Sequence, residues 1–288
     1  MRYAKPQSTD EAIALLGSDT WRLLAGGTDF YPAQGSRPIR DNILDLNGLA
    51  DLRHVTHSQD SVIFGARATW TDVIRAELPP AFDCLKLAAR EVGSVQIQNT
   101  GTIAGNLCNA SPAADGVPPL LTLDAQVELR SRAATRMIPL HDFILGNRDT
   151  ARQADELVTA IHVPRAAAAG VSHFVKLGAR RYLVISIAMT AVRLTLDGER
   201  RVADAAIAVG ACSAVARRLP ALERAIVGLP AGSGLAKTVE SYDFAELSPI
   251  DDVRGTGVYR LAAAREIVAR AVDGAVAKAI GKPAEVAA

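Results

Sequence analysis

The stretch around which this chain is organised is Ser94-Val-Gln-Ile-Gln-Asn-Thr-Gly-Thr-Ile-Ala-Gly-Asn-Leu-Cys-Asn-Ala-Ser-Pro-Ala-Ala-Asp-Gly-Val-Pro-Pro-Leu-Leu-Thr-Leu-Asp124. It is rich in small, hydroxyl and amide side chains and contains no Lys, Arg or Glu. Gly101 and Gly105 allow positive φ and a close approach of the backbone to a ligand. Successive amides in such a loop can point into one concavity, which suits an anion such as a pyrophosphate. A tight turn with a capped helix after it is the more common role, so both interpretations stay open here.

A second glycine-rich loop lies nearer the N-terminus. Leu23-Leu-Ala-Gly-Gly-Thr-Asp-Phe30 is an apolar run that enters a Gly-Gly-Thr turn. Its adjacent glycines do not match the dinucleotide pattern G-x-G-x-x-G, and no Gly-Lys-Ser/Thr follows as in a Walker loop. A Gly-Gly turn between a strand and a helix is also common as a purely structural connection. The two loops together predict two sets of backbone amides that are able to bind phosphate, outside both well-known nucleotide signatures.

Three motifs together resemble the FAD-binding medium subunit of the molybdenum hydroxylases, the family that includes the flavin parts of xanthine dehydrogenase and carbon monoxide dehydrogenase. The motifs are residues 25–29, residues 99–107 with 111–115, and residues 174–181, where the family has a Phe-x-Lys-x-x-x-Arg-Arg pattern. They occur in the family's order and spacing, and the resemblance covers nearly the whole chain. One departure is Ala104, where many relatives have glycine, so φ is more restricted there. The extra cysteines of the benzoyl-thioester-reducing relatives are missing, which excludes that branch.

The resemblance implies a site for non-covalently bound FAD. Asp29 and Asp115 cannot neutralise a phosphate, so we expect them to face ribityl or ribose hydroxyls or a ring N–H. Lys176 is the expected cation for the electron-rich edge of the flavin. The assignment of Val158 to the site is based only on the likeness of residues 156–163 to a strand of the family. No residue is predicted to be catalytic or to bind a metal. The positions that the resemblance places against FAD are Leu23, Leu24, Ala25, Gly26, Gly27, Thr28, Asp29, Phe30, Thr102, Ala104, Gly105, Asn106, Leu107, Asp115, Val158 and Lys176.

Composition is that of an ordinary soluble protein with about two domains. The chain has 288 residues, of which 49% are hydrophobic and 22% charged, and its net charge of +1 favours neither nucleic acid nor an anionic membrane as a partner. Its three cysteines form no C-x-x-C pair, which argues against a disulfide framework, a zinc ribbon and an iron–sulfur cluster within this chain. The N-terminus has no apolar signal region and no apolar run is long enough to span a bilayer, so we expect a cytoplasmic protein.

Local patterns predict an α+β fold. They divide residues 1–165 into a small α/β unit (about 1–52) and an antiparallel sheet with helices (53–165), and the resemblance implies that together these form a two-part FAD-binding domain of the PCMH type. A smaller C-terminal α+β flavoprotein domain with a three-stranded antiparallel sheet should follow over 171–288. Strands are predicted at 3–5, 21–25, 43–46, 62–66, 125–130, 136–140, 156–163, 173–177, 185–195 and 202–210, and helices at 9–16, 28–33, 69–77, 81–91, 114–123, 220–227 and 257–280, with a flexible loop at 229–234.

The resemblance implies that the chain is the FAD-containing electron-transfer subunit of a molybdenum hydroxylase. Electrons would pass from a small [2Fe–2S] subunit through FAD to NAD, a quinone, ferredoxin or oxygen. A large molybdopterin subunit would complete a heterotrimer and bind the substrate, so molybdopterin and [2Fe–2S] are expected only in the partner subunits. Two alternatives remain, a stand-alone FAD-dependent reductase of the same fold and a non-catalytic flavin-binding protein. Only the first hypothesis predicts partner chains that carry molybdenum and iron–sulfur centres.

Overall fold

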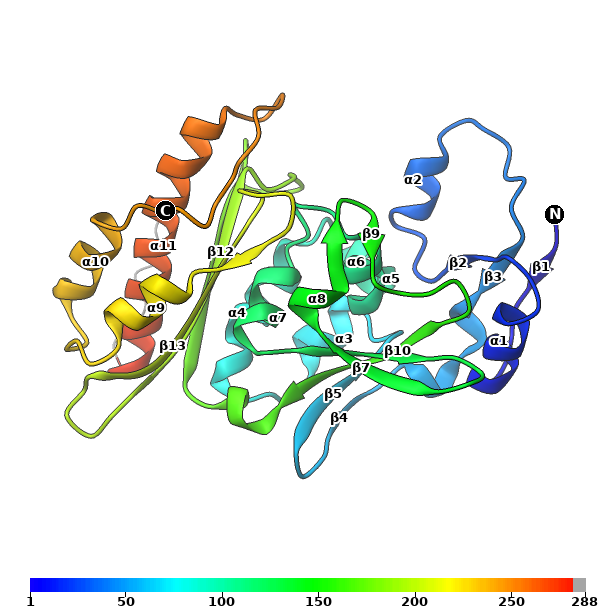
Figure 1. The fold of residues 1–288 in the computed structure, drawn as a ribbon, viewed down its shortest axis with the longest axis horizontal. Helices are drawn as coiled ribbons and strands as arrows, with labels where there is room; N and C mark the ends of the chain where they lie inside the picture. Colours follow the sequence, from blue (N-terminus) through cyan, green and yellow to red (C-terminus); the bar gives the residue numbers. More distant parts are fainter. Residues whose placement is uncertain (282–288) are drawn as a thin grey trace.

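The N-terminal part of the chain is a small parallel sheet with two helices (Figure 1). We describe residues 1–281 from a computed structural model; residues 282–288, the end of the predicted C-terminal domain, lie outside the described part. The sheet has the strand order β1-β3-β2. The Ser8 hydroxyl caps the first helix by accepting the amide of Glu11, and the Glu11 carboxylate accepts the amide of Gln7. The elements are β1 (Tyr3–Ala4), α1 (Thr9–Leu16), β2 (Arg22–Leu24), α2 (Phe30–Gln34), β3 (Ile43–Asp45) and the 3₁₀ turns Leu46–Gly48 and Ala50–Leu52.

The middle of the chain forms the predicted antiparallel sheet, with five strands in the order β4-β5-β10-β6-β7. Along β6, Val127 and Leu129 are fully buried while Gln126 and Glu128 are only partly covered, as the alternating pattern requires. Its strands are β4 (Val55–His57), β5 (Ser61–Gly65), β6 (Gln126–Arg130), β7 (Thr135–Pro139) and β10 (Leu157–Pro164), and a separate hairpin pairs β8 (Ile144–Gly146) with β9 (Asp149–Thr150).

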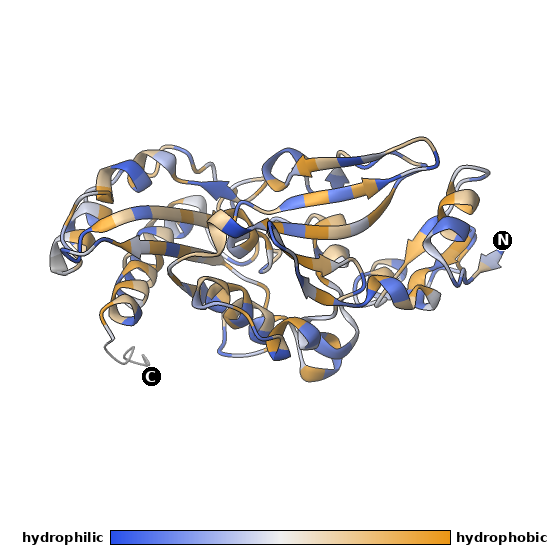
Figure 2. Cartoon of the chain, turned by 90° about the horizontal axis from the view of Figure 1, so that it is seen from below, coloured by the Kyte–Doolittle hydropathy of each residue, from blue (hydrophilic) through white to orange (hydrophobic). Residues whose placement is uncertain are grey.

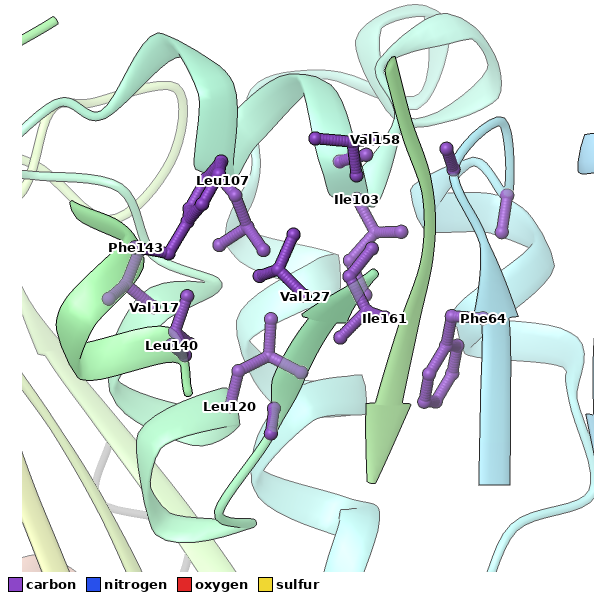
Figure 3. Packing of buried hydrophobic residues seen from close by; sticks show 14 of the residues in the cluster. Phe64, Ile103, Leu107, Val117, Leu120, Val127, Leu140, Phe143, Val158 and Ile161 are labelled. Atoms are coloured by element: carbon purple, nitrogen blue, oxygen red, sulfur yellow. The ribbon is translucent and has the colours of Figure 1, made fainter. Parts of the chain in front are cut away.

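Helices supply the other side of this core. Figure 3 shows Ile103 and Leu107 of α6 and Leu120 of α7 packed beside Val127 and Ile161 of the sheet. The helices are α3 (Trp70–Arg75), α4 (Asp83–Glu91), α5 (Val95–Thr100), α6 (Ile103–Asn109), α7 (Val117–Thr122) and α8 (Leu140–Phe143), with 3₁₀ turns at Pro80–Phe82 and Arg165–Ala168.

The central stretch is more helical than the sequence analysis predicted. We expected a loop that leads to a helix from residue 114, yet α5 and α6 occupy much of that loop and α7 begins only at Val117. The physical reason is a pair of N-caps. The Ser94 hydroxyl accepts the amide of Ile97, and the Thr102 hydroxyl accepts the amide of Gly105.

The C-terminal part is an antiparallel sheet covered by three helices. The three predicted strands are present as β11 (Val171–Leu177), β12 (Ala188–Leu196) and β13 (Val202–Gly210), and the short β14 (Arg217–Arg218) adds a fourth. Figure 2 shows polar and apolar bands along the strands of the sheets. The prediction of a flexible loop over residues 229–234 is wrong for its last two residues, because α10 (Ser233–Glu240) begins there. The other helices are α9 (Pro220–Ile226) and the long α11 (Gly257–Ala279), which packs on β11 and β12.

The two larger parts are fastened to each other by packing and by buried polar contacts. Helix α4 packs on β11, and α7 packs on β12 and β13. The buried guanidinium of Arg193 donates to the carbonyl oxygen of Thr122 at 2.9 Å, and the Ser172 hydroxyl accepts the amide of Cys84 at 2.8 Å. These contacts fix the position of β11 and β12 beside the middle sheet. No helix within residues 1–281 has the length and apolar character needed to cross a bilayer.

Candidate functional site

A large cavity of about 830 Å³ lies where the central stretch meets the first glycine loop. Its walls come from the loop after β2, from α5 and α6, from β10 and from the segment that precedes β12. Both predicted glycine-rich segments therefore face the same space, although the chain runs through α3 and α4 between them. A volume of this size is at the upper end of what proteins use for small-molecule ligands.

The glycine end of the cavity is the turn at residues 26–29. Gly26 is packed so tightly that an added Cβ would overlap the carbonyl oxygen of Thr100, and Gly27 has φ +76°. Both positions therefore need glycine, one for close approach and one for backbone conformation. The backbone N–H groups of residues 26–29 donate no hydrogen bond to any described residue. Four successive amides are thus free to bind an anion.

The second predicted loop has a different role. Thr102 is the N-cap of α6, and its hydroxyl and carbonyl oxygens accept the amides of Gly105 and Asn106. The amide of Ile103 donates to Ala68. Most amides that we expected to bind phosphate here are therefore already used within the protein. What this segment offers instead is the side chain of Asn106, whose Oδ1 is buried and has no partner among the described residues.

A second region of the cavity wall, which we call the lysine end, is Asp115 together with Lys176 and Ser186, which contact its carboxylate from behind the wall. Lys176 Nζ lies 2.6 Å from Asp115 Oδ2 and also donates to the Glu91 carbonyl oxygen at 3.2 Å. The Ser186 hydroxyl donates to Asp115 Oδ1 at 2.5 Å. Both charged side chains are less than a tenth exposed. Burial raises the pKa of the Asp115 carboxyl, and the Lys176 ammonium opposes that shift.

Most of the predicted site residues line this one cavity; the exceptions are Leu24, Leu107 and Lys176. Leu24 and Leu107 are buried in the hydrophobic core, so their side chains support the wall from behind. Lys176 lies behind Asp115, which does line the cavity. At the other end, Asp29 accepts a hydrogen bond from Asn109 Nδ2 at 3.1 Å. Whether each of these residues binds FAD stays a prediction.

Several cavity residues were missed by the sequence analysis. Arg67 lines the wall and is partly buried; its Nε is buried and has no partner among the described residues, and burial lowers the pKa of its guanidinium. Trp70 is buried beneath Gly101. Neither carries a local signal, because they reach the cavity only through the packing of β5 and α3. Other lining residues outside the prediction include Arg22, Leu46, Leu52, Ile97, Cys108, Arg148, Arg152, Leu157, Leu183, Val184 and Ile185.

The residues present fit a dinucleotide such as FAD. The diphosphate needs donors, and residues 26–29 supply free amides. The ribose and ribityl hydroxyls need partners, and Asn106 Oδ1 and Arg67 Nε are a buried acceptor and a buried donor that lack them. The flat rings need apolar walls, which Leu23 and Val158 help to form. Within residues 1–281 no group of three or more His, Cys, Asp or Glu side chains is placed to hold a metal ion.

Comparison with known families divides the chain into two matched regions. Residues 1–166 match the family described as the FAD binding domain in molybdopterin dehydrogenase. Residues 173–275 match the family described as the CO dehydrogenase flavoprotein C-terminal domain.

Curated relatives are similar along almost their whole length. The chain is 31% identical over 269 residues to the glyceraldehyde dehydrogenase medium chain of Sulfolobus acidocaldarius, covering 92% of this chain and 93% of that one. It is 28% identical over 281 residues to the carbon monoxide dehydrogenase medium chain of Hydrogenophaga pseudoflava, covering 96% and 97%.

Solved structures agree with these matches. The reconstituted CO dehydrogenase from Oligotropha carboxidovorans contains a chain with a TM-score of 0.89 at 26% identity, covering 96% of this chain and 98% of that chain. Quinoline 2-oxidoreductase from Pseudomonas putida 86 contains one with a TM-score of 0.88 at 26% identity, covering 97% and 98%.

Proposed function

Because this chain belongs to the family of FAD-binding subunits of the molybdopterin dehydrogenases, we propose that it carries electrons through FAD from an iron–sulfur partner to an external acceptor. The chain is a subunit of an oxidoreductase of the xanthine dehydrogenase and CO dehydrogenase type, and FAD is its cofactor. The observation that carries the proposal is the single cavity that both glycine-rich segments line. The route of the electrons and the sites of contact are the parts proposed here.

The glycine end of the cavity would hold the diphosphate. Its amides at residues 26–29 point at no acceptor in the described protein, so they can bind phosphate oxygens without breaking an existing hydrogen bond. Asn106 Oδ1 would accept a hydrogen bond from a hydroxyl of the ribityl chain or the ribose, and Arg67 Nε would donate one to such a hydroxyl. Leu23, Leu157 and Val158 would cover a ring. This placement agrees with the predicted FAD contacts of residues 23, 25–30, 102, 104–106, 115 and 158, all of which line the cavity.

The lysine end would hold the part of the cofactor that exchanges electrons. When bound, the flavin accepts and releases electrons. Lys176 cannot act there as an isolated cation, because Asp115 neutralises it at 2.6 Å. The pair instead presents Asp115 to the cavity as a fixed carboxylate, held on its other side by Ser186. We expect it to orient a ring N–H or a hydroxyl rather than to change the net charge of the site.

The partners follow from the same family. We propose a small [2Fe–2S] subunit that donates electrons and a large molybdopterin subunit that binds the substrate, with NAD, a quinone, ferredoxin or oxygen as acceptor. The domain division at 1–165 and 171–288 is likewise a proposal. Support for it comes from two separate hydrophobic clusters, one built largely from residues 12–163 and one from residues 188–276.

The visible spectrum of the purified full chain tests the cofactor. Oxidised flavin bands that bleach on anaerobic reduction, with FAD released by heating, are the expected result. A colourless chain that takes up no added FAD, alone or with its co-purified partners, would contradict the site. A colourless chain that binds FAD only with its partners would support the site and show that assembly completes it.

Co-purification tests the electron route. A tagged chain isolated from its natural host should bring two partner chains that carry molybdenum and [2Fe–2S] centres. In that complex, substrate should bleach the flavin when the acceptor is absent. A flavin-loaded chain that purifies alone and reduces a substrate by itself would favour the stand-alone reductase instead.

A further inference from the structure

Five arginines gather at the rim of the glycine end. Two smaller hollows of about 520 and 680 Å³ adjoin the main cavity beside α2 and the β8–β9 hairpin. We call their basic lining the arginine groove; it consists of Arg22, Arg37, Arg40, Arg148 and Arg152. Asp41 is the only carboxylate among the residues that line the two hollows. The formal charge of the whole chain is only +1, so positive charge is concentrated at this rim.

The positive charge of this groove is poorly compensated within the protein. Arg22 stacks on the Phe30 ring at 4.0 Å and reaches Asp41 at 3.3 Å. Arg37 and Arg152 donate only to backbone carbonyl oxygens. The side chains of Arg40 and Arg148 make no hydrogen bond or ion pair with any described residue. One weak carboxylate contact therefore faces five guanidinium groups, and an anion from solution would be strongly attracted.

The groove is continuous with the main cavity. Arg22 and Arg148 line both the hollows and the cavity, and the free amides at residues 26–29 lie next along the wall. Arg37 and Arg40 lie outside the cavity, exposed in the segment between α2 and β3. A positively charged path thus leads from solvent to the amides that we assign to the diphosphate.

We propose that the arginine groove captures the anionic diphosphate of FAD from solution and guides it to the glycine end. The inference rests on the proposed function, since it takes FAD as the ligand of the cavity. A positively charged cleft raises the association rate of an oppositely charged ligand by factors of about 10 to 1,000. Because Arg37 and Arg40 lie outside the cavity, they act on the approach of FAD and not on the bound state.

The test is the rate of FAD association with the full chain stripped of FAD, or with its partner complex if only the complex binds FAD. Stopped-flow quenching of tryptophan fluorescence is a suitable signal, since Trp70 lines the cavity. For Arg37→Gln/Arg40→Gln we expect association about tenfold slower at low ionic strength. The difference should disappear at about 0.5 M salt, where charges are screened. Dissociation should change by less than about twofold, because the bound contacts remain.

A matched control separates the position of the charges from their number. Arg200→Gln/Arg224→Gln removes the same net charge from exposed residues of the C-terminal part, at the opposite end of the molecule from α2 (Figure 1). Its association rate should equal that of the unmodified chain. Inorganic pyrophosphate should slow FAD association with the unmodified chain and have less effect on the Arg37→Gln/Arg40→Gln variant.

The outcomes separate the two proposals. A protein that binds no FAD in any form contradicts the proposed function. FAD binding with an unchanged association rate in the groove variant contradicts only the capture site. So does an equal slowing in both double variants, since net charge alone would then explain the effect. A change confined to dissociation would also overturn the inference, because it would make these arginines part of the bound state.

Discussion

The two ends of the cavity differ in whether their polar and charged groups find partners within the protein. At the glycine end, four backbone amides have no acceptor within the described protein, and basic side chains around them are exposed and scarcely paired. At the lysine end, Lys176 and Asp115 are almost fully buried and pair with each other, and Ser186 completes the carboxylate's contacts. Water can satisfy the open amides until a ligand arrives, whereas buried charges must be satisfied by the protein itself.

This difference indicates which end contributes to the stability of the fold and which end contributes mainly to ligand binding. The glycine end can be empty at little cost in stability, because its donors remain solvated. The lysine end has to be complete before any ligand binds, since an unpaired buried charge is costly. Substitutions at the lysine end should therefore weaken the protein itself, and substitutions at the glycine end should mainly weaken its binding.

Lys176→Met should have the largest effect, because it leaves the Asp115 carboxylate buried without its cation. We expect the free energy of unfolding of the FAD-free chain to fall by about 3–5 kcal/mol, measured by urea denaturation. Burial already raises the pKa of Asp115, and losing the ammonium raises it further. A carboxyl whose pKa is higher in the folded state destabilises the fold as pH rises, so the loss should be smaller at about pH 5 than at about pH 8.

The matched variant for that prediction is Lys176→Met/Asp115→Asn. Removing the charge of Asp115 should restore part of the lost stability. It should also abolish the difference between about pH 5 and about pH 8 in the stability that Lys176→Met loses. If Lys176→Met costs less than about 1 kcal/mol, the lysine end is not held by its ion pair and the contrast between the two ends fails.

Gly26→Ala should come next, and it tests the glycine end. The added methyl group would overlap the Thr100 carbonyl, which is backbone and cannot rotate away. Such overpacking costs about 1–3 kcal/mol and must shift the loop. We expect FAD affinity to fall by about 100-fold in a fluorescence titration, because the shift of the loop would displace the four amides. Affinity within about threefold of the unmodified chain would show that these amides do not hold the diphosphate.

Cys108 should report whether ligand fills the glycine end. Its thiol lines the cavity, and burial raises its pKa to about 11. Since the thiolate is the reactive form, alkylation of the FAD-free chain should speed up about tenfold between pH 8 and pH 9. Added FAD should slow that reaction about tenfold, as mass spectrometry of the labelled peptide would reveal. The fully buried Cys84 and Cys212 serve as internal controls, and equal labelling of all three would indicate unfolding.

Gly105→Ala should have the smallest effect and completes the comparison. Its added Cβ would meet only the Thr102 hydroxyl at 2.8 Å, and alanine favours the helix by about 1 kcal/mol over glycine. These contributions oppose each other, so we expect both stability and FAD binding energy to change by less than about 1 kcal/mol. A loss as large as that of Gly26→Ala would show that the α6 segment binds the diphosphate after all.

Local patterns predicted the framework well and the central stretch poorly. The parallel α/β unit, the antiparallel middle sheet and strands β11–β13 follow from alternation and turn residues. Helices α5 and α6 were missed because glycine and β-branched residues mask their periodicity, although the Ser94 and Thr102 caps were a readable signal. Helix α10 was missed because Gly232 and Gly234 surround its first residue.

The sequence by itself determined where glycine had to stand and which segments could be strands, because these depend on neighbouring residues. It also identified the family, since the motifs keep their order along the chain. Only the tertiary structure decided which amides stay free, because Thr102 and Ala68 accept most of those in the α6 segment, whereas no described residue accepts those of residues 26–29. It alone paired Lys176 with Asp115 across 61 residues, since such contacts depend on how β11 packs beside the central helices. For the same reason, only the folded chain brings the five arginines to one rim.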